Sequence, residues 1–230
     1  MKLVLFDIDG TLLWTDGAGR RAMEGALFEI FGRHGDPTYR YDGKTDKQIA
    51  REQMRGAGFE DEQITARMDD VLQAYVQRLD LELERDAATS RLCAGVQPLL
   101  DAVESQARAT MGLLTGNIEP GARRKLRAVG VDFARFRVNA FGSDHEERPQ
   151  LPVVAQLRAE QFLGTAMSGD RMVIIGDTPA DIHCGRALGV RAIGVATGRY
   201  SVDDLAAHHP AAVFETLEDT DAVLAAILGG

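Results

Sequence analysis

Short apolar runs alternate with longer amphipathic stretches along most of the chain. Continuous apolar runs of this length are typical of strands that are buried on both faces of a sheet. We expect such strands at Leu3–Phe6, Met111–Leu114, Val138–Phe141, Met172–Ile175, Ala192–Val195 and Ala212–Phe214. Helices are predicted between most of them, at Val96–Ala107, Pro120–Val129, Leu151–Leu163, Ala180–Leu188 and Leu217–Leu228. This alternation predicts a doubly wound α/β fold with a parallel sheet.

One long stretch interrupts the alternation. From Trp14 to about Arg91 the sequence contains no good strand and has a helical pattern. Apolar residues recur there at spacings of three and four, which is typical of a helix face that packs on other helices; they are Ile64, Met68, Val71, Leu72, Tyr75, Val76 and Leu79. We therefore expect a core of residues 1–15 and 91–230 and an inserted helical cap of residues 16–90, with linkers near 14–19 and 84–92.

The composition of the chain restricts the kinds of molecule that it is expected to bind. The 230 residues carry a formal net charge of -9, which argues against a general nucleic-acid binder because phosphate backbones require a basic surface. A local cationic site for a small anion remains compatible with this charge. No apolar run approaches the roughly 20 residues of a membrane helix, and the two cysteines, Cys93 and Cys184, have no metal-site spacing. We expect a cytoplasmic protein with reduced thiols, no membrane partner and an N-terminal core strand in place of a signal peptide.

Polar residues follow the predicted strands directly. Asp7 and Asp9 come after the first strand, residues 115–117 (Thr-Gly-Asn) after the second, and Asp177 and Asp181 after the fourth. Ligands bind at the carboxyl ends of the strands in parallel sheets, so these segments are candidates for one site. Two carboxylates as close as Asp7 and Asp9 repel each other, and a nearby cation is expected to offset that repulsion.

Four segments in this order carry a family resemblance. They are "DIDGT" (7–11), "LLTGN" (113–117), "ERPQLP" (147–152) and "IIGDTPAD" (174–181). Together they resemble the four motifs of the haloacid dehalogenase (HAD) superfamily, in particular its phosphoglycolate phosphatase-like branch. The resemblance implies a Rossmann-like core with a helical cap. It also implies magnesium-dependent hydrolysis of a small phosphate monoester through an aspartyl-phosphate, with phosphoglycolate as the default substrate.

The resemblance also implies roles for individual residues. Asp7 would attack phosphorus, and Asp9 would protonate the leaving oxygen and later deprotonate water. A Mg²⁺ ion would be bound by an Asp7 carboxylate oxygen, the Asp9 backbone carbonyl and Asp177, with Asp181 in support. Such an ion would offset the repulsion between the clustered acids.

The phosphate group needs hydrogen-bond donors and a cation. The Thr115 hydroxyl, with Gly116 and Asn117, lies at a predicted strand-to-helix turn that suits phosphate binding. Arg148 would neutralise charge on the phosphoryl group, although its second proline comes one place later than in the family pattern. Lys125 is the alternative cation.

In the predicted cap, "YDGKTDKQI" (41–49) resembles a substrate-contact loop. Lys44 and Thr45 could reach a substrate carboxylate or phosphate. The same residues could instead form a turn that starts the next helix with Thr45 as its cap, and both interpretations could hold together.

Three other functions remain as alternatives. A dehalogenase has no use for an acid two residues after its nucleophile, so Asp9 favours phosphoryl transfer. A phosphosugar mutase of the same superfamily keeps both aspartates, whereas a non-catalytic phosphate-binding module could lose either of them. The expected partner is a small phosphorylated metabolite, and the oligomeric state is left open.

Overall fold

The computed structural model describes residues 1–85 and 87–229, and its centre is a six-stranded sheet. The strand order is β5-β4-β1-β6-β7-β8, and every neighbouring pair is parallel. The strands are β1 (Lys2–Phe6), β4 (Ala109–Thr115), β5 (Val138–Phe141), β6 (Met172–Gly176), β7 (Arg191–Val195) and β8 (Ala212–Phe214). The predicted doubly wound α/β fold is confirmed.

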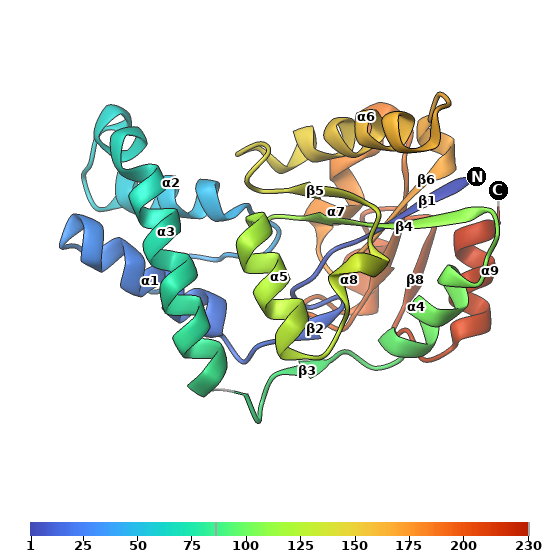
Figure 1. Ribbon diagram of the computed structural model, residues 1–230, viewed down its shortest axis with the longest axis horizontal. Helices are drawn as coiled ribbons and strands as arrows, with labels where there is room; N and C mark the ends of the chain where they lie inside the picture. Colours follow the sequence, from blue (N-terminus) through green and yellow to red (C-terminus); the bar gives the residue numbers. More distant parts are fainter. Residues whose placement is uncertain (86, 230) are drawn as a thin grey trace.

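Helices cover both faces of the sheet (Figure 1). One apolar cluster joins the sheet to α4 (Val96–Glu104), α5 (Glu119–Ala128) and α9 (Thr220–Leu228). A second cluster on the opposite face joins it to α6 (Leu151–Leu163) and α7 (Pro179–Cys184), and Leu205 of the short α8 (Val202–Ala206) packs nearby on Ala192. The predicted helix Ala180–Leu188 is interrupted after Cys184, and a 3-10 turn, Arg186–Leu188, follows.

The central strand β1 shows why an apolar run forms a strand here. Leu3 and Leu5 pack in the cluster with α6, whereas Val4 and Phe6 pack in the cluster with α4 and α5. Successive side chains of a strand point to opposite faces, so a strand covered on both faces needs apolar residues at every position.

Three helices lie together at one end of the molecule (Figure 1). They are α1 (Ala18–Phe31), α2 (Asp46–Gly56) and α3 (Asp61–Arg85), and we call them the helical unit. They share an apolar cluster of their own that includes the predicted stripe on α3. Two short strands, β2 (Leu13–Trp14) and β3 (Arg91–Leu92), pair antiparallel where the chain leaves the sheet and returns. This ribbon was not predicted, and the second predicted linker includes residue 86, which lies outside the described residues.

The sheet order places several strand ends side by side. The chain passes from β1 to β4 on one side and later reaches β6 on the other side, so β1 lies at the point where the winding reverses. Phe6 pairs in register with Leu113 of β4 and with Ile175 of β6. The residues that follow β1, β4 and β6 therefore meet at one edge, which is where ligands bind in such folds.

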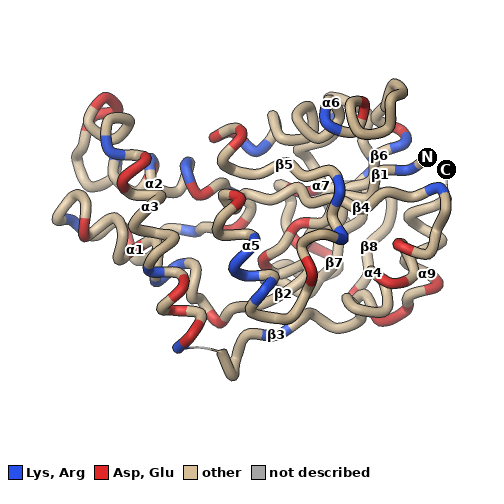
Figure 2. Tube along the Cα trace, in the orientation of Figure 1, with Lys and Arg blue, Asp and Glu red and all other residues tan. Residues whose placement is uncertain are grey.

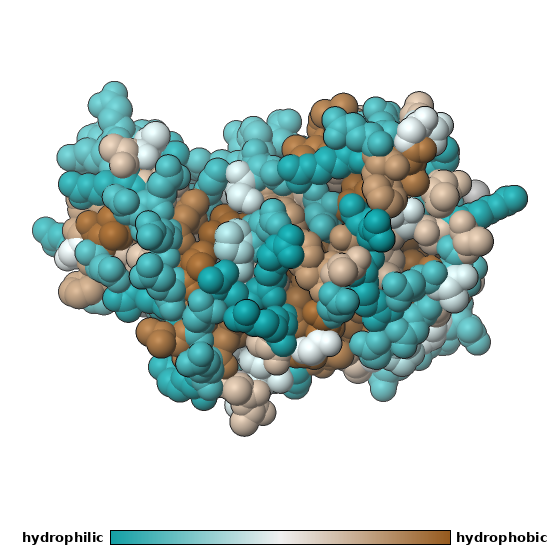
Figure 3. All heavy atoms as spheres, in the orientation of Figure 1, coloured by the Kyte–Doolittle hydropathy of each residue, from teal (hydrophilic) through white to brown (hydrophobic). Residues whose placement is uncertain are grey.

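The surface is mixed in charge and mostly polar. Figure 2 shows acidic and basic residues interspersed over the whole fold. Figure 3 shows a mainly hydrophilic face, with apolar atoms gathered over α6, where Val153, Leu157 and Phe162 are exposed. Among the described residues, no helix has the length and apolar character that crossing a membrane requires.

Candidate active site

The loop after β1 presents alternate residues to the site. Ile8 and Leu12 are fully buried in the core, and the Ile8 carbonyl accepts hydrogen bonds from the backbone N–H groups of Thr11, Leu12 and Leu13. This tight turn leaves Asp7 and Asp9 facing the edge of the sheet. Asp7 is 6% exposed, and its backbone N–H donates to Ile175 of β6.

Asp177 lies beside this loop, as its position after β6 predicted. The Thr11 hydroxyl donates to Asp177 Oδ1 at 3.0 Å, and both side chains are buried. Glycines make room for this carboxylate, because a Cβ atom at Gly10 or at Gly198 would overlap it. Gly10 also has φ = +83°, a conformation that side chains with a Cβ rarely adopt.

Three buried acids come together at this point. Asp7, Asp177 and Asp181 each offer a carboxylate oxygen, and the three oxygens lie within 4.8 Å of one another. Burial raises the pKa of Asp7 to about 6, although Arg148 opposes this, and burial with the neighbouring acids raises the pKa of Asp177 well above its usual range. Such a concentration of buried carboxylate oxygens suits a hard divalent cation.

Asp181 differs from the other two acids because its oxygens already have partners. It forms a capping box with Thr178 at the start of α7, and its Oδ2 accepts from the Thr178 hydroxyl at 2.6 Å. Its Oδ1 accepts from Arg148. Asp7 and Asp177 are therefore the better ligands for a cation, and Asp181 holds the neighbouring groups in place.

Arg148 lies between two of these acids. It begins a 3-10 turn, Arg148–Gln150, that leads into α6, and it is 4% exposed. Its Nη2 is 3.1 Å from Asp7 Oδ1 and also pairs with Asp181. The shifted second proline, Pro152, lies in the first turn of α6 and leaves Arg148 beside Asp7.

Lys125 occupies a different place from Arg148. It lies on α5, and its Nζ is 2.8 Å and 2.7 Å from the two carboxylate oxygens of Asp9. The two acids of the loop thus have separate cations: Arg148 contacts Asp7 and Lys125 contacts Asp9. Each acid of the loop therefore has a cationic side chain beside it, apart from any metal ion.

The segment after β4 connects these groups. The Asn117 side-chain amide donates to Asp9 Oδ2 at 2.7 Å and to the Thr115 hydroxyl at 2.8 Å. The Gly116 carbonyl accepts from the backbone N–H of Asp46, in α2, at 2.8 Å. All three predicted residues line the cavity, and Gly116 is also a point of contact with the helical unit.

The predicted cap residues Lys44 and Thr45 have different environments. Lys44 lines the cavity, but its ammonium group donates to Glu52 at 2.6 Å and to the Tyr39 hydroxyl at 2.7 Å. The Thr45 hydroxyl accepts from the Gln48 backbone N–H as the cap of α2 and donates to the Glu146 carbonyl. Thr45 is fully buried and does not reach the cavity, so the capping interpretation describes its contacts.

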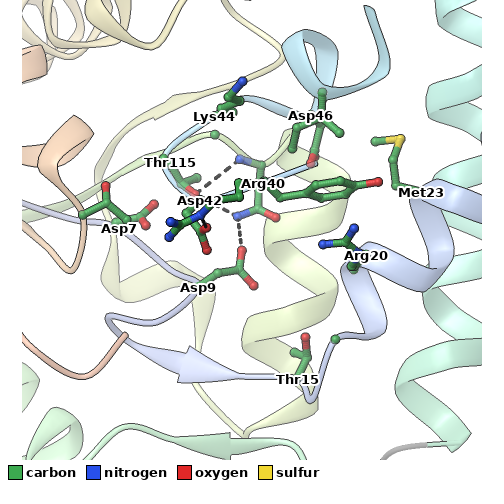
Figure 4. A pocket seen from close by; sticks show the side chains of 18 of the residues that line it. Asp7, Asp9, Thr15, Arg20, Met23, Arg40, Asp42, Lys44, Asp46 and Thr115 are labelled. Carbon is green, nitrogen blue, oxygen red and sulfur yellow. Dashed lines mark hydrogen bonds and ion pairs between the residues drawn. The ribbon is translucent and has the colours of Figure 1, made fainter. Parts of the chain in front are cut away.

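A cavity of about 410 Å³ lies between the strand ends and the helical unit. Figure 4 shows Asp7, Asp9 and Thr115 on its sheet side and Arg20, Met23 and Asp46 on the side of the helices. The loop 41–49, which resembled a substrate-contact loop, contributes Asp42 and Asp46 to this cavity as well as Lys44, whereas sequence reasoning did not assign Arg20, Arg40 and Tyr75 to a site. Tyr75 lay on the apolar stripe of α3, which carries no signal that distinguishes a cavity wall from a packing face.

Comparison with known proteins agrees with this geometry. The HAD-hydrolase-like family model matches residues 149–220, which include Asp177 and Asp181. The curated protein "Probable phosphatase IndB" of Dickeya dadantii is 27% identical over 227 residues, which are 98% of this chain and 94% of that protein. Over residues 149–220 the chain resembles the HAD-like hydrolases. The resemblance and the enzyme class that its motifs predicted are thereby confirmed.

Solved structures share the whole fold of this chain. A hydrolase from Pseudomonas syringae superposes with a TM-score of 0.71 at 20% identity, covering 99% of each chain. A structure described as a predicted phosphoglycolate phosphatase from Haemophilus somnus gives a TM-score of 0.68 at 18% identity, covering 97% of this chain and 98% of that one. At these identities the likeness establishes the fold and leaves the substrate to be argued from the site.

Proposed function

We propose that this protein is a magnesium-dependent phosphatase that hydrolyses a small phosphate monoester through an aspartyl-phosphate on Asp7. One observation carries the proposal: Asp7 is buried at the tip of β1 with the Arg148 guanidinium on one side and the Asp177 carboxylate close by. Phosphoryl transfer needs a nucleophile between positive groups that neutralise the moving phosphoryl group.

The carboxylates of Asp7 and Asp177 are the residues that would hold the metal, together with the backbone carbonyl of Asp9. If both were ionised, these buried carboxylates would carry more negative charge than Arg148 alone balances, and a divalent cation at this point would stabilise the ionised forms. Mg²⁺ favours few carboxylates and keeps phosphate oxygens and waters as further ligands. When bound, it would neutralise charge on the phosphate.

Individual side chains take separate roles in the proposed reaction. Asp7 attacks phosphorus while Asp9 gives a proton to the leaving oxygen, so the alcohol departs neutral and Asp7 carries the phosphoryl group. Water next attacks phosphorus, gives its proton to Asp9, and releases phosphate and the Asp7 carboxylate. Arg148, fixed by Asp181, holds the phosphoryl oxygens throughout.

The helical unit would act as the cap, with the hinge near residues 16–19. It closes the cavity opposite the strand ends, which would exclude bulk water from the reaction. The volume of about 410 Å³ lies within the range of about 300–1,000 Å³ typical of small-molecule sites. Phosphoglycolate and larger phosphate monoesters are both candidate substrates, and a phosphorylated metabolite of this kind is the proposed partner.

The test is hydrolysis of phosphate monoesters with and without Mg²⁺ and a chelator. Asp7→Asn should lower kcat at least about 1,000-fold, because the amide cannot form the phosphoenzyme, while the melting temperature is kept. Asp170→Asn is the matched control, since Asp170 is exposed just before β6, at the opposite edge of the sheet.

Retained turnover by Asp7→Asn, or full activity of the wild type in excess chelator, would reject the proposed mechanism. Measuring released inorganic phosphate in the presence of sugar phosphates distinguishes a phosphatase from a mutase. A mutase would transfer the phosphoryl group to the sugar and release little phosphate.

A further inference from the structure

Lys125 is a buried ammonium group whose donors are all used. The residue is 4% exposed, and Nζ lies 2.8 Å from Asp9 Oδ1, 2.7 Å from Asp9 Oδ2 and 2.7 Å from Asn117 Oδ1. An ammonium group has three N–H donors, so these three oxygens satisfy it completely. No donor of Lys125 is left for a phosphate oxygen.

The two oxygens of Asp9 differ in what they accept. Among the described residues, Oδ2 accepts from Lys125 and from the Asn117 amide, whereas Oδ1 accepts from Lys125 alone. The Asp9 side chain is 39% exposed and lines the cavity. Oδ1 is therefore the oxygen with a free lone pair that can carry a proton to or from a bound substrate.

Asn117 is fixed by the same network. Its amide nitrogen donates to Thr115 and Asp9, and its carbonyl oxygen accepts from Lys125. Lys125 thus orients Asp9 both directly and through Asn117. Each of these side chains would lose an anchor if the ammonium group were removed.

The helical unit covers this network from the other side. A Cβ atom at Gly19 of α1 would lie only 3.0 Å from Lys125 Nζ, and Tyr75 of α3 lies against Gly121 of α5 at the same place. The backbone of α1 therefore approaches the ammonium group closely. The ammonium side of this ion pair is therefore shielded from water, whereas the Asp9 carboxylate stays open to the cavity.

We propose that Lys125 is the residue that positions Asp9 for proton transfer, with Asp9 Oδ1 as the proton-carrying oxygen. The inference rests on the proposed phosphatase function, in which the P–O bond to the leaving group breaks as the bond from Asp7 to phosphorus forms. The proton moves from Asp9 Oδ1 to the leaving oxygen, and the attacking water later returns a proton to the same atom. Lys125 itself does not touch the substrate.

If Lys125 positions Asp9, the loss of rate on removing Lys125 should depend on the leaving group of the substrate. An alkoxide is a poor leaving group and needs the proton from Asp9, whereas nitrophenolate departs readily without it. Misplacing Asp9 should therefore slow an alkyl phosphate far more than a nitrophenyl phosphate. A general loss of structure would slow both substrates alike.

The experiment compares Lys125→Met with the wild type on nitrophenyl phosphate and on a simple alkyl phosphate monoester. We expect kcat to fall about 100-fold for the alkyl ester, within the usual range for a general acid, and less than about fivefold for nitrophenyl phosphate, with little change in KM for either. Lys125→Gln, which keeps one donor for Asp9, should show the same pattern to a smaller extent. Arg127→Met is the matched control, because this α5 side chain is largely exposed.

Equal losses of kcat on both substrates in Lys125→Gln would overturn the proposal, and so would a large rise in KM on both, which would assign Lys125 to phosphate binding. Asp7→Asn distinguishes a failure of the positioning role of Lys125 from a failure of the phosphatase mechanism. Turnover that requires Asp7 but shows no leaving-group dependence in the Lys125 variants overturns the positioning role alone. Turnover that does not require Asp7 overturns the phosphatase mechanism as well.

Discussion

At the scale of single residues, glycines surround the acids of the site. A Cβ atom at Gly10 or Gly198 would overlap the Asp177 carboxylate, and one at Gly176 would overlap the side chain of Asp181. Each glycine comes from a different loop or strand end, so the acids can approach one another from several directions. The absence of side chains at these positions gives the carboxylates the space that a bound cation would need.

We predict that Gly198→Ala weakens Mg²⁺ binding. The new methyl group would displace the Asp177 carboxylate, so the metal affinity measured by titration calorimetry should fall at least about tenfold, since about 1.4 kcal/mol of lost binding free energy suffices for that factor. Gly194→Ala is the control in the preceding strand, because its Cβ would meet the Leu205 and Val213 side chains at ordinary distances of 3.4 Å and 3.6 Å. Equal affinity in the two variants would show that Asp177 does not bind the ion.

The sequence predicted some of these contacts and missed others for a clear reason. Asp7 and Asp177 directly follow strands, and adjacent parallel strands bring their ends together whatever the details of packing. Lys125 lies on a helix ten residues after Thr115. Its target depends on how α5 is rotated and on the reach of a long side chain, so it was predicted only as an alternative phosphate ligand.

At the scale of secondary structure, the N-terminus of α5 is capped by a side chain from another helix. No side chain at its own N-cap position, Ile118, satisfies the first turn. The Asp46 carboxylate of α2 accepts from the Ile118 backbone N–H at 2.8 Å instead. Burial raises the pKa of Asp46 to about 6, although Lys125 and this hydrogen bond act in the opposite direction.

We predict that Asp46→Asn stabilises the protein near neutral pH. A carboxyl group whose pKa rises from 3.8 to about 6 on folding makes the folded state less stable as pH rises between these values. The asparagine oxygen keeps the hydrogen bond without this cost, which is at most about 3 kcal/mol. The melting temperature of Asp46→Asn should therefore exceed that of the wild type by several degrees at pH 7.5 and match it near pH 4.

Asp219→Asn controls for the chemical change itself. Asp219 is an exposed helix cap that accepts from the Ala222 backbone N–H, a bond that asparagine makes equally well. The melting temperature of the Asp219→Asn variant should equal that of the wild type across the whole pH range. A difference between Asp46→Asn and the wild type that does not vary with pH would contradict the assignment.

The helices and strands that were predicted correctly are those with a clear apolar pattern in the sequence. The six core strands and the long helix α3 have continuous or strongly periodic apolar patterns, and the structure contains each of them. The strands β2 and β3 have two residues each, which is too short for any pattern, and they exist because the ends of the inserted segment meet. The break after Cys184 likewise arises from packing, since Gly185 lies against Val190 and Ile174.

At the scale of the whole molecule, a few polar contacts connect the helical unit to the sheet domain. Lys47 donates to the Ser143 carbonyl at 2.9 Å, and Arg51 pairs with Glu146 at 2.6 Å. The Thr45 hydroxyl also donates to the Glu146 carbonyl. These contacts join the start of α2 to the loop between β5 and Arg148. If the helical unit opens as the proposed cap, these contacts must break, so they should set how readily it opens.

Removing one of these ion pairs should loosen the contact between the helical unit and the sheet domain without unfolding either. We predict that Glu146→Gln raises amide hydrogen exchange at residues 44–48 and 142–147 about two- to fivefold, because a partly exposed pair is worth up to about 1 kcal/mol. Glu29→Gln is the matched control, since it removes the Arg78–Glu29 pair between α3 and α1, which lies within the helical unit. In 1 M salt, which shortens the screening length to about 3 Å, the difference between the two variants should shrink. Equal exchange in both variants at low salt would mean that the Arg51–Glu146 pair does not hold the cap closed, and that the backbone contacts of Gly116 with α2 carry that task.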